Sequence, residues 1–374
     1  MKFLHCADLH IGRRLMQVSL IEDQKYILRQ ILDIAKRHHV DALIIAGDVY
    51  DKNSPSEEAF SLWDWFLVEL ANHQLETIVI SGNHDSNDRL GVGKRLLERT
   101  SIHVITHLTS TINPITIANV DFYPIPFIKP VYVANVYEDF KSSNYQEAYQ
   151  FVLDRLELKN DRKNVMIGHQ FFVSGSSEPE IAQSETGLTL GGLDAINTTI
   201  LEAFDYVALG HIHRPQRIGS DTIRYSGSIL KYAFEEAQQR KSVTLVTVDD
   251  TVVYDQIPLK PFRDVRVIKG PIDELIKIGE TETSQDYIHA IITDETVVHN
   301  AITRLQRVYP NTLTLEVQNQ LSTHNGSLQR AEEVVSKKPL ELVHDFFEQQ
   351  TGRDLNDAEQ HLVVSILDEI GDVS

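Results

Sequence analysis

Residues 3–10, Phe-Leu-His-Cys-Ala-Asp-Leu-His, join a short apolar run to an Asp-x-His motif. The apolar run has the composition of a buried strand, so Asp8 and His10 are expected just beyond its carboxyl end. The same arrangement recurs along the chain. Strand-like runs at residues 42–46, 77–81, 165–167 and 206–209 are followed by Gly47-Asp48, Gly82-Asn83-His84-Asp85, Gly168-His169 and Gly210-His211-Ile212-His213.

Amphipathic helical stretches separate the first strands, which is the patterning of an α/β fold. One helical face is marked by Leu20, Ile27, Leu28, Ile31, Leu32 and Ala35, and another by Phe60, Trp63, Phe66, Leu67 and Leu70. Later runs at residues 223–225, 242–248 and 252–256 follow one another without helices, which favours a mixed sheet or a second sheet. We therefore expect two sheets flanked by helices. Because carboxyl ends of strands line the ligand crevice in such sheets, the five motifs are expected to converge.

The residue types in these motifs predict a metal centre. Asp, Asn and neutral His suit manganese, iron or zinc, and no cysteine lies near the four later motifs, which excludes a cysteine-rich zinc site. The candidate ligands exceed the needs of one ion, so two ions sharing one carboxylate are expected. His84 is then available for chemistry. The seven candidate ligands are Asp8, His10, Asp48, Asn83, His169, His211 and His213.

Each motif alone has an ordinary structural interpretation. A single Asp-x-His pair is expected by chance among 16 histidines, and Gly168-His169 alone is typical of a turn. Cys6, flanked by apolar residues, is interpreted as a small core residue. The histidines outside the motifs are interpreted as surface or satisfied core residues: His5, His38, His39, His73, His103 and His107. Five motifs in this order at strand ends make coincidence a poor explanation.

The sequence also predicts three segments. Two prolines at 258 and 261 indicate a boundary, so residues 1–260 form the predicted metal-binding domain. Residues 261–321 restart with strands near 262–268, 287–293 and 313–317 and helices near 272–276 and 297–308, a small α+β unit. Residues 322–374 read as a linker and two amphipathic helices. These helices dock either on a partner chain or on the main body, and the sequence favours neither.

Composition limits the partners of this chain. A formal charge of −19 counts against DNA binding by the chain alone, unless bound cations or a partner supply positive charge. The single cysteine and the absence of a signal-peptide pattern make the cytoplasm the expected location. No apolar stretch approaches the roughly 20 residues needed to cross a bilayer, so no membrane association is expected.

Taken together, the motifs resemble those of the calcineurin-like metallophosphoesterases, which carry Asp-x-His, Gly-Asp, Gly-Asn-His-Asp/Glu, Gly-His and Gly-His-x-His in this order. Within that family the chain is similar to bacterial DNA nuclease subunits. That similarity rests on residues 5–12, 47–51, 82–86 and 225–243 and on the junction at 258–262; it is firm to about residue 268 and loose beyond it. The resemblance implies a two-sheet (αββα) sandwich, a small α+β capping domain and C-terminal partner-binding helices.

The resemblance also implies roles for individual residues. Asp8, His10 and His213 would hold one ion, Asn83, His169 and His211 the other, and Asp48 would bridge them. His84 would stabilise the transition state or protonate the leaving oxygen. Asp85 would either orient the His84 ring or cap a helix beginning near Asn87. Archaeal and eukaryotic relatives carry a histidine where Asp51 stands here, and Asp51 would instead order its loop.

The implied activity is manganese-dependent cleavage of DNA, as an exonuclease on duplex ends and an endonuclease on single strands and hairpins. The implied assembly is a homodimer within a heterotetramer, with an ATPase partner of the SbcC type that contains a coiled coil, acting in DNA repair, recombination and replication. Arg13, Arg14, Arg89, Lys94 and Arg95 are candidates for phosphate contacts, or simply a solvated surface. The alternatives are a small-molecule phosphodiesterase or phosphatase of the same fold, and a metal-free interaction scaffold.

Overall fold

The computed structural model describes residues 1–318 except 176, 183–193, 283 and 297, together with residues 347, 353–356, 359–360 and 362–363. The chain divides into two compact units, Met1–Val265 and Arg266–Ser374. The predicted linker and C-terminal helices lie almost entirely outside the described residues. No helix among the described residues is long and apolar enough to cross a membrane.

Two six-stranded sheets form the first unit. In the first sheet the strand order is β16-β15-β1-β4-β5-β6, and β1, β4, β5 and β6 run parallel to one another. These strands are β1 Lys2–Cys6, β4 Ala42–Ala46, β5 Glu76–Ile80, β6 Ile102–Ile105, β15 Ser242–Val248 and β16 Val252–Pro258.

In the second sheet the order is β13-β14-β12-β9-β8-β7, with β8, β9, β12 and β14 parallel. Its strands are β7 Ile115–Ile117, β8 Val120–Pro124, β9 Lys163–His169, β12 Tyr206–Gly210, β13 Gln216–Ile218 and β14 Ser220–Tyr225. Two small ribbons pair β2 Arg14–Leu15 with β3 Val18–Ser19, and β10 Phe172–Val173 with β11 Ile196–Asn197.

The inner faces of the two sheets pack against each other in one apolar core. Phe3 of β1 contacts Phe122 of β8 edge-on, with ring centroids 5.4 Å apart, and Tyr206 of β12 at 5.7 Å. Ile44 and Ile167 belong to the same buried cluster. This packing brings the carboxyl ends of β1, β4 and β5 next to those of β9 and β12, so the prediction of two stacked sheets is confirmed.

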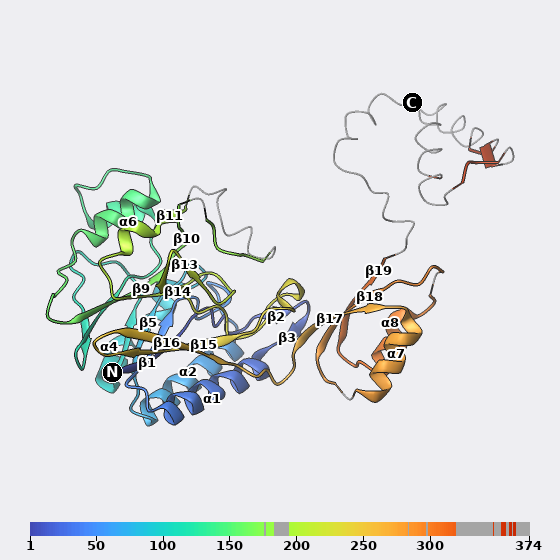
Figure 1. Cartoon of the computed structure of the whole chain (residues 1–374), viewed down its shortest axis with the longest axis horizontal. Coiled ribbons are helices and arrows are strands. Elements are labelled where there is room, and N and C mark those ends of the chain that lie inside the picture. The colour runs from blue at the N-terminus through green and yellow to red at the C-terminus, as the bar shows by residue number, and fades with distance from the viewer. Residues whose placement is uncertain are drawn as a thin grey trace. The chain divides into compact units, whose positions relative to one another are not determined.

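Helices cover the outer faces of both sheets (Figure 1). Helices α1 and α2 lie beside the first sheet, while α5 and α6 share a buried cluster with the second sheet. Helix α2 begins after Ser56, whose hydroxyl accepts a hydrogen bond from the Ala59 N–H, and α6 begins after Asn144 in the same way. The helices are α1 Ile21–His38, α2 Glu57–Asn72, α3 Asn87–Leu90, α4 Lys94–Leu97, α5 Pro130–Val136 and α6 Tyr145–Leu153; the 3₁₀ turns are η1 Glu98–Thr100, η3 Thr198–Leu201 and η4 Phe234–Glu236.

Among its described residues, the second unit contains a three-stranded sheet in the order β17-β18-β19 and two helices that share a buried apolar cluster. Its elements are β17 Val265–Gly270, α7 Ile272–Thr281, β18 Tyr287–Ile292, α8 Ala301–Gln306 and β19 Thr312–Val317. The element order agrees with the predicted βαβαβ pattern, whereas the boundary at 260/261 stays a prediction.

Some local predictions were wrong. Strand β17 begins at Val265, not at Phe262, which is 61% exposed, and α8 is shorter than the predicted helix over 297–308. Phe60 was expected on a buried helical face but is 41% exposed, with its ring edge-on against Tyr50. Apolar character marked these positions, but the local fold leaves them near solvent.

Candidate metal centre

The seven candidate ligands converge where the two sheets meet. Asp8, Asp48 and Asn83 lie just beyond β1, β4 and β5 of the first sheet. His169 ends β9, and His211 directly follows β12, in the second sheet. Hydrogen bonds join the sheets at this point. The His211 N–H donates to Asp8 at 2.9 Å, and His169 Nδ1 lies 2.7 Å from the Ala46 carbonyl oxygen.

Two overlapping groups of side chains have the spacing of metal ligands. Asp8, His10 and His213 form one group and Asp8, Asp48 and His169 the other, with ligand atoms in each group within 4.8 Å of one another. Asp48 lies between them, because its Oδ2 is 3.6 Å from His10 Nε2 and 3.3 Å from His169 Nε2. A carboxylate in that position can contact two ions.

Asn83 completes the second group. Its Oδ1 lies 3.0 Å from His169 Nε2 and 3.0 Å from His211 Nδ1. His169 uses Nδ1 for the Ala46 carbonyl, so in the neutral ring Nε2 carries a lone pair directed at the Asn83 and Asp48 oxygens. The Asn83 oxygen, the Asp48 oxygen and His169 Nε2 are thus acceptors that face one another. A divalent cation bound between them would supply the positive charge that this arrangement favours.

The pKa values of buried residues at this site are shifted by burial and by neighbouring charges. Burial alone would lower the pKa of His169, but the nearby Asp48 carboxylate raises it to about 9, so this ring is protonated at neutral pH without a metal and would lose that proton when an ion binds. Burial also raises the pKa of Asp8 to about 7 and lowers that of His211 to about 3. A neutral imidazole is the form that binds metal, so His211 is in the ligating state at neutral pH. The residue set therefore fits a binuclear centre.

The backbone at the ligand positions adopts conformations that side chains other than glycine rarely take. The φ angles are 53° at Asp8, 41° at His10, 51° at Asp48 and 101° at His211. Such left-handed residues cost free energy and cluster at functional sites. All four of these residues are candidate ligands.

Two glycines let the backbone come close to the ligands. A Cβ on Gly82 would collide with the Asp48 carboxylate, and one on Gly210 would collide with the Ala46 carbonyl oxygen. Gly82 and Gly210 are therefore required by the close approach of the backbone to neighbouring atoms.

His84 lies beside the ligands without belonging to either group. Its Nδ1 is 2.9 Å from the Asp51 carbonyl oxygen, and its ring packs edge-on against His10 with centroids 4.9 Å apart. With Nδ1 engaged, Nε2 is left for a substrate or leaving group. The main-chain N–H of His84 donates to Asp48 Oδ1 at 2.9 Å, which links this residue to the predicted bridging carboxylate.

Asp85 has a different environment from the one predicted. Its carboxylate accepts hydrogen bonds from the N–H groups of Gly82, Val49 and Tyr50 at 2.9–3.1 Å. The predicted contact with the His84 ring is therefore wrong, and so is the predicted helix cap, because α3 has Ser86 as its N-cap residue. Asp85 instead fastens the loop after β5 to the loop after β4, which positions the motifs relative to each other.

Sequence reasoning missed a buried carboxylate behind His213. Glu236 is fully buried in η4, and its Oε1 lies 3.1 Å from His213 Nδ1. Its Oε2 is 2.6 Å from Nζ of Lys241, which also donates to the His213 carbonyl oxygen at 2.8 Å. Only the sequence interval between 225 and 243, already noted for its similarity to the nuclease subunits, pointed to this region.

The cations predicted to contact phosphates are mostly engaged within the protein. Arg13 Nη1 donates to Asp51 Oδ1 at 2.8 Å, so Asp51 orders this loop. Arg14 donates to the Gln17 carbonyl oxygen, and Arg89 to the Asn53 carbonyl oxygen and to Ser54 Oγ. Lys94 and Arg95 lie in α4, half-buried and exposed respectively.

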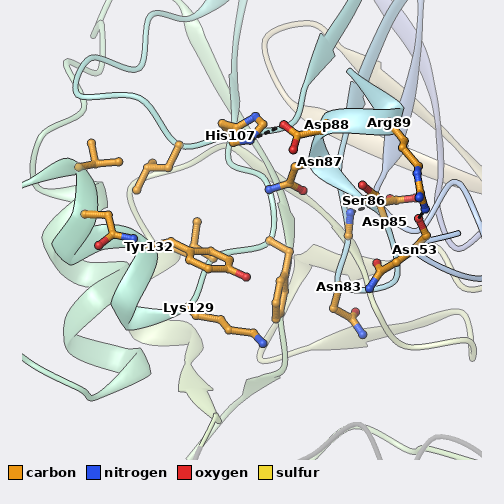
Figure 2. Close-up of a pocket in the computed structure, with 16 residues that line it drawn as sticks. Asn53, Asn83, Asp85, Ser86, Asn87, Asp88, Arg89, His107, Lys129 and Tyr132 are labelled. Carbon is orange, nitrogen blue, oxygen red and sulfur yellow. Dashed lines mark hydrogen bonds and ion pairs between the residues drawn. The ribbon is translucent and has the colours of Figure 1, made fainter. Parts of the chain in front are cut away.

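A pocket of about 790 Å³ opens next to the centre (Figure 2). Asn83 and Asp85 lie on one side of it, and Lys129 and Tyr132 on the other. The pocket adjoins the candidate metal centre at Asn83 and is larger than a phosphate ion needs.

Comparisons with known proteins agree with this geometry. Residues 1–215 match the model of the calcineurin-like phosphoesterase family, and residues 261–351 match that of the type 5 capsule protein repressor C-terminal domain. The SbcD subunit of the nuclease SbcCD from Staphylococcus epidermidis is 32% identical over 382 residues, covering 99% of this chain and 100% of that protein. The chain belongs to the SbcD-type calcineurin-like metallophosphoesterases.

Solved structures similar to this SbcD-type chain include an archaeal phosphodiesterase and a dimetal phosphatase from Danio rerio. The first has a TM-score of 0.34 and 12% identity, over 69% of this chain and 100% of the other. The second has a TM-score of 0.44 and 12% identity, over 69% of this chain and 96% of the other. The SbcD-type family predicted from the motifs is confirmed by the full-length relative and the family models.

Proposed function

We propose that the chain is the nuclease component of a DNA-processing complex and hydrolyses phosphodiesters with two manganese ions. The observation that carries this proposal is the convergence of Asp48 and the six other candidate ligands between the ends of two sheets. Two ions about 4 Å apart would activate a water and neutralise charge on the phosphoryl oxygens. DNA as the substrate rests on the full-length similarity to a protein named as part of a nuclease.

The proposed role of each residue follows from its contacts. Asp8, His10 and His213 are proposed to hold one ion, Asn83, His169 and His211 the other, with Asp48 between them. The His84 ring, oriented by the Asp51 carbonyl oxygen, is proposed to protonate the leaving oxygen or to stabilise charge in the transition state.

An ATPase partner is part of the proposal because the chain is acidic. With a formal charge of −19, non-specific attraction to DNA has to come from elsewhere, and an SbcC-type partner would supply it. We propose that residues 322–374 bind this partner and that two copies of the chain assemble with it in the cytoplasm. Deleting residues 327–374 should abolish co-purification with the partner while leaving hydrolysis of a small diester intact. Retained binding would assign the partner interface to another part of the chain.

A metal-free scaffold is disfavoured because all seven candidate positions carry side chains that can coordinate a metal, and four of them have positive φ angles. A small-molecule phosphodiesterase would use the same ligands, so substrate choice has to be tested directly. We expect the full-length protein to cleave linear duplex and hairpin DNA with manganese, and the Asp8→Asn variant to be inactive on both. Full activity after complete chelation would contradict the metal mechanism. Hydrolysis of a chromogenic diester without any DNA cleavage would favour the small-molecule enzyme.

A further inference from the structure

The pocket beside Asn83 has dimensions that a phosphate alone does not explain. Its volume of about 790 Å³ lies in the range of sites that bind whole small molecules. Asn83, a proposed metal ligand, forms part of one side, so the pocket adjoins the proposed metal centre at this residue. Whatever follows the reacting phosphate in the substrate can enter the pocket.

The opposite side of the pocket is fixed to both sheets. The Phe127 N–H donates to the Ser81 carbonyl oxygen at 2.9 Å, and the Ile128 N–H donates to Gln170 Oε1 at 3.1 Å. The Phe127 ring also packs edge-on against His169, with centroids 6.4 Å apart. These contacts hold the segment that leads into α5 at a set distance from the metal centre.

Lys129 and Tyr132 extend from this segment into the pocket (Figure 2). Tyr132 is 39% exposed, so its ring is open to a ligand. Lys129 is exposed and, among the described residues, its ammonium group forms no hydrogen bond or ion pair. By contrast, Arg89 on the other side is already bonded to Asn53 and Ser54.

The carboxylates in the lining do not oppose an anionic ligand at Lys129. Asp85 is engaged by three backbone N–H groups, and Asp88 pairs with His107 at 3.7 Å on the far side from Lys129 (Figure 2). An unpaired cation next to an exposed aromatic ring is the combination that binds single-stranded nucleic acid, since the ring stacks on a base and the cation contacts a phosphate.

We propose that this pocket binds the nucleotide adjacent to the scissile phosphate, with its base on Tyr132 and its next phosphate at Lys129. The assignment rests on the proposed nuclease function and adds a subsite for one unpaired nucleotide. It requires the terminal nucleotide to leave the duplex before cleavage. Lys129 and Tyr132 are thus specificity-determining residues that lie outside the metal ligand set.

The test measures kinetics of the full-length chain with manganese on a single-stranded oligonucleotide and on a chromogenic phosphodiester without a base. Lys129→Ala and Tyr132→Ala should each raise KM for the oligonucleotide about tenfold, with kcat and turnover of the chromogenic diester unchanged. Lys129→Arg and Tyr132→Phe keep the charge and the ring, so both should restore the oligonucleotide KM. Lys36→Ala, which alters an exposed lysine in the last turn of α1, is the matched control.

Inhibition of chromogenic turnover gives a second measurement. Deoxyadenosine monophosphate should inhibit the Tyr132→Ala variant about tenfold more weakly than the wild type, whereas inorganic phosphate should inhibit both equally. Equal oligonucleotide KM values in the wild type and both alanine variants would overturn the subsite while leaving the nuclease proposal standing. If the wild type hydrolyses the chromogenic diester but no oligonucleotide, the proposed function itself fails.

Discussion

Replacing Glu236 by glutamine should weaken metal binding, because this carboxylate fixes the orientation of His213. Burial alone would raise the pKa of Glu236, but the charge of Lys241 and the hydrogen bond with His213 lower it to about 2. Glu236 is therefore anionic at neutral pH and accepts the Nδ1 proton of His213 at 3.1 Å. That tautomer leaves the lone pair on Nε2, which lies 3.1 Å from His10 Nε2 in the proposed ligand group.

Glu236→Gln should lower both the metal affinity and the folding stability. Loss of a carboxylate that orients a ligating histidine typically lowers metal affinity about 10–100-fold. Loss of its charge also breaks the ion pair with Lys241, which is only 5% exposed, and breaking such a buried pair costs about 3–5 kcal/mol of folding stability. The double variant Glu236→Gln with Lys241→Met removes both charges, so it should recover part of the stability but none of the metal affinity.

Isothermal titration with manganese chloride after chelator treatment measures the affinity, and urea unfolding in the presence of chelator measures the stability. We expect the single variant to lose both and the double variant to remain impaired in metal binding. Wild-type manganese affinity in a folded Glu236→Gln protein would refute the reasoning, because Glu236 would then serve only to stabilise the fold.

Three further predictions follow from the same contacts. Gly82→Ala places a Cβ against the Asp48 carboxylate, so manganese should no longer stabilise the variant in thermal melts; a wild-type metal-induced shift would contradict this. His84→Ala should lower kcat about 10²–10⁴-fold with unchanged manganese stoichiometry, and undiminished DNA cleavage would remove its proposed role. Burial lowers the pKa of His5 to about 3, so the ring is neutral in the folded protein at neutral pH. Its contribution to the free energy of unfolding is complete above pH 6.5. That contribution falls by about 1.4 kcal/mol per pH unit as the pH drops from 6.5 toward 3. Urea unfolding of chelated wild type and His5→Asn between pH 6.5 and 4.5 should show a stability difference that shrinks with falling pH, and a constant difference would contradict the assignment.

The candidate metal centre could be predicted from the sequence because each of its motifs is a local pattern. Each motif follows an apolar strand, and parallel strands end at a common edge, so Asp8 and Asp48 were expected to approach each other. The α/β class followed from the same alternation. Helix α1 was visible for a similar reason, since its apolar positions recur at helical spacing.

The roles of Asp85, Glu236 and Lys129 could not be predicted from the sequence, because they depend on contacts that only the fold creates. Asp85 accepts from backbone N–H groups of another loop, which carry no side-chain signal. Glu236 lies in a short 3₁₀ turn, and only the fold brings it to His213 and Lys241. Lys129 looks like any exposed lysine in the sequence; its importance arises from the pocket it faces.

Anomalous diffraction from crystals grown with manganese tests the binuclear centre most directly. We predict two anomalous peaks per chain about 4 Å apart. One should lie among Asp8, His10 and His213 and the other among Asn83, His169 and His211, with Asp48 contacting both. A single peak, or no peak at these residues, would contradict the two-metal account.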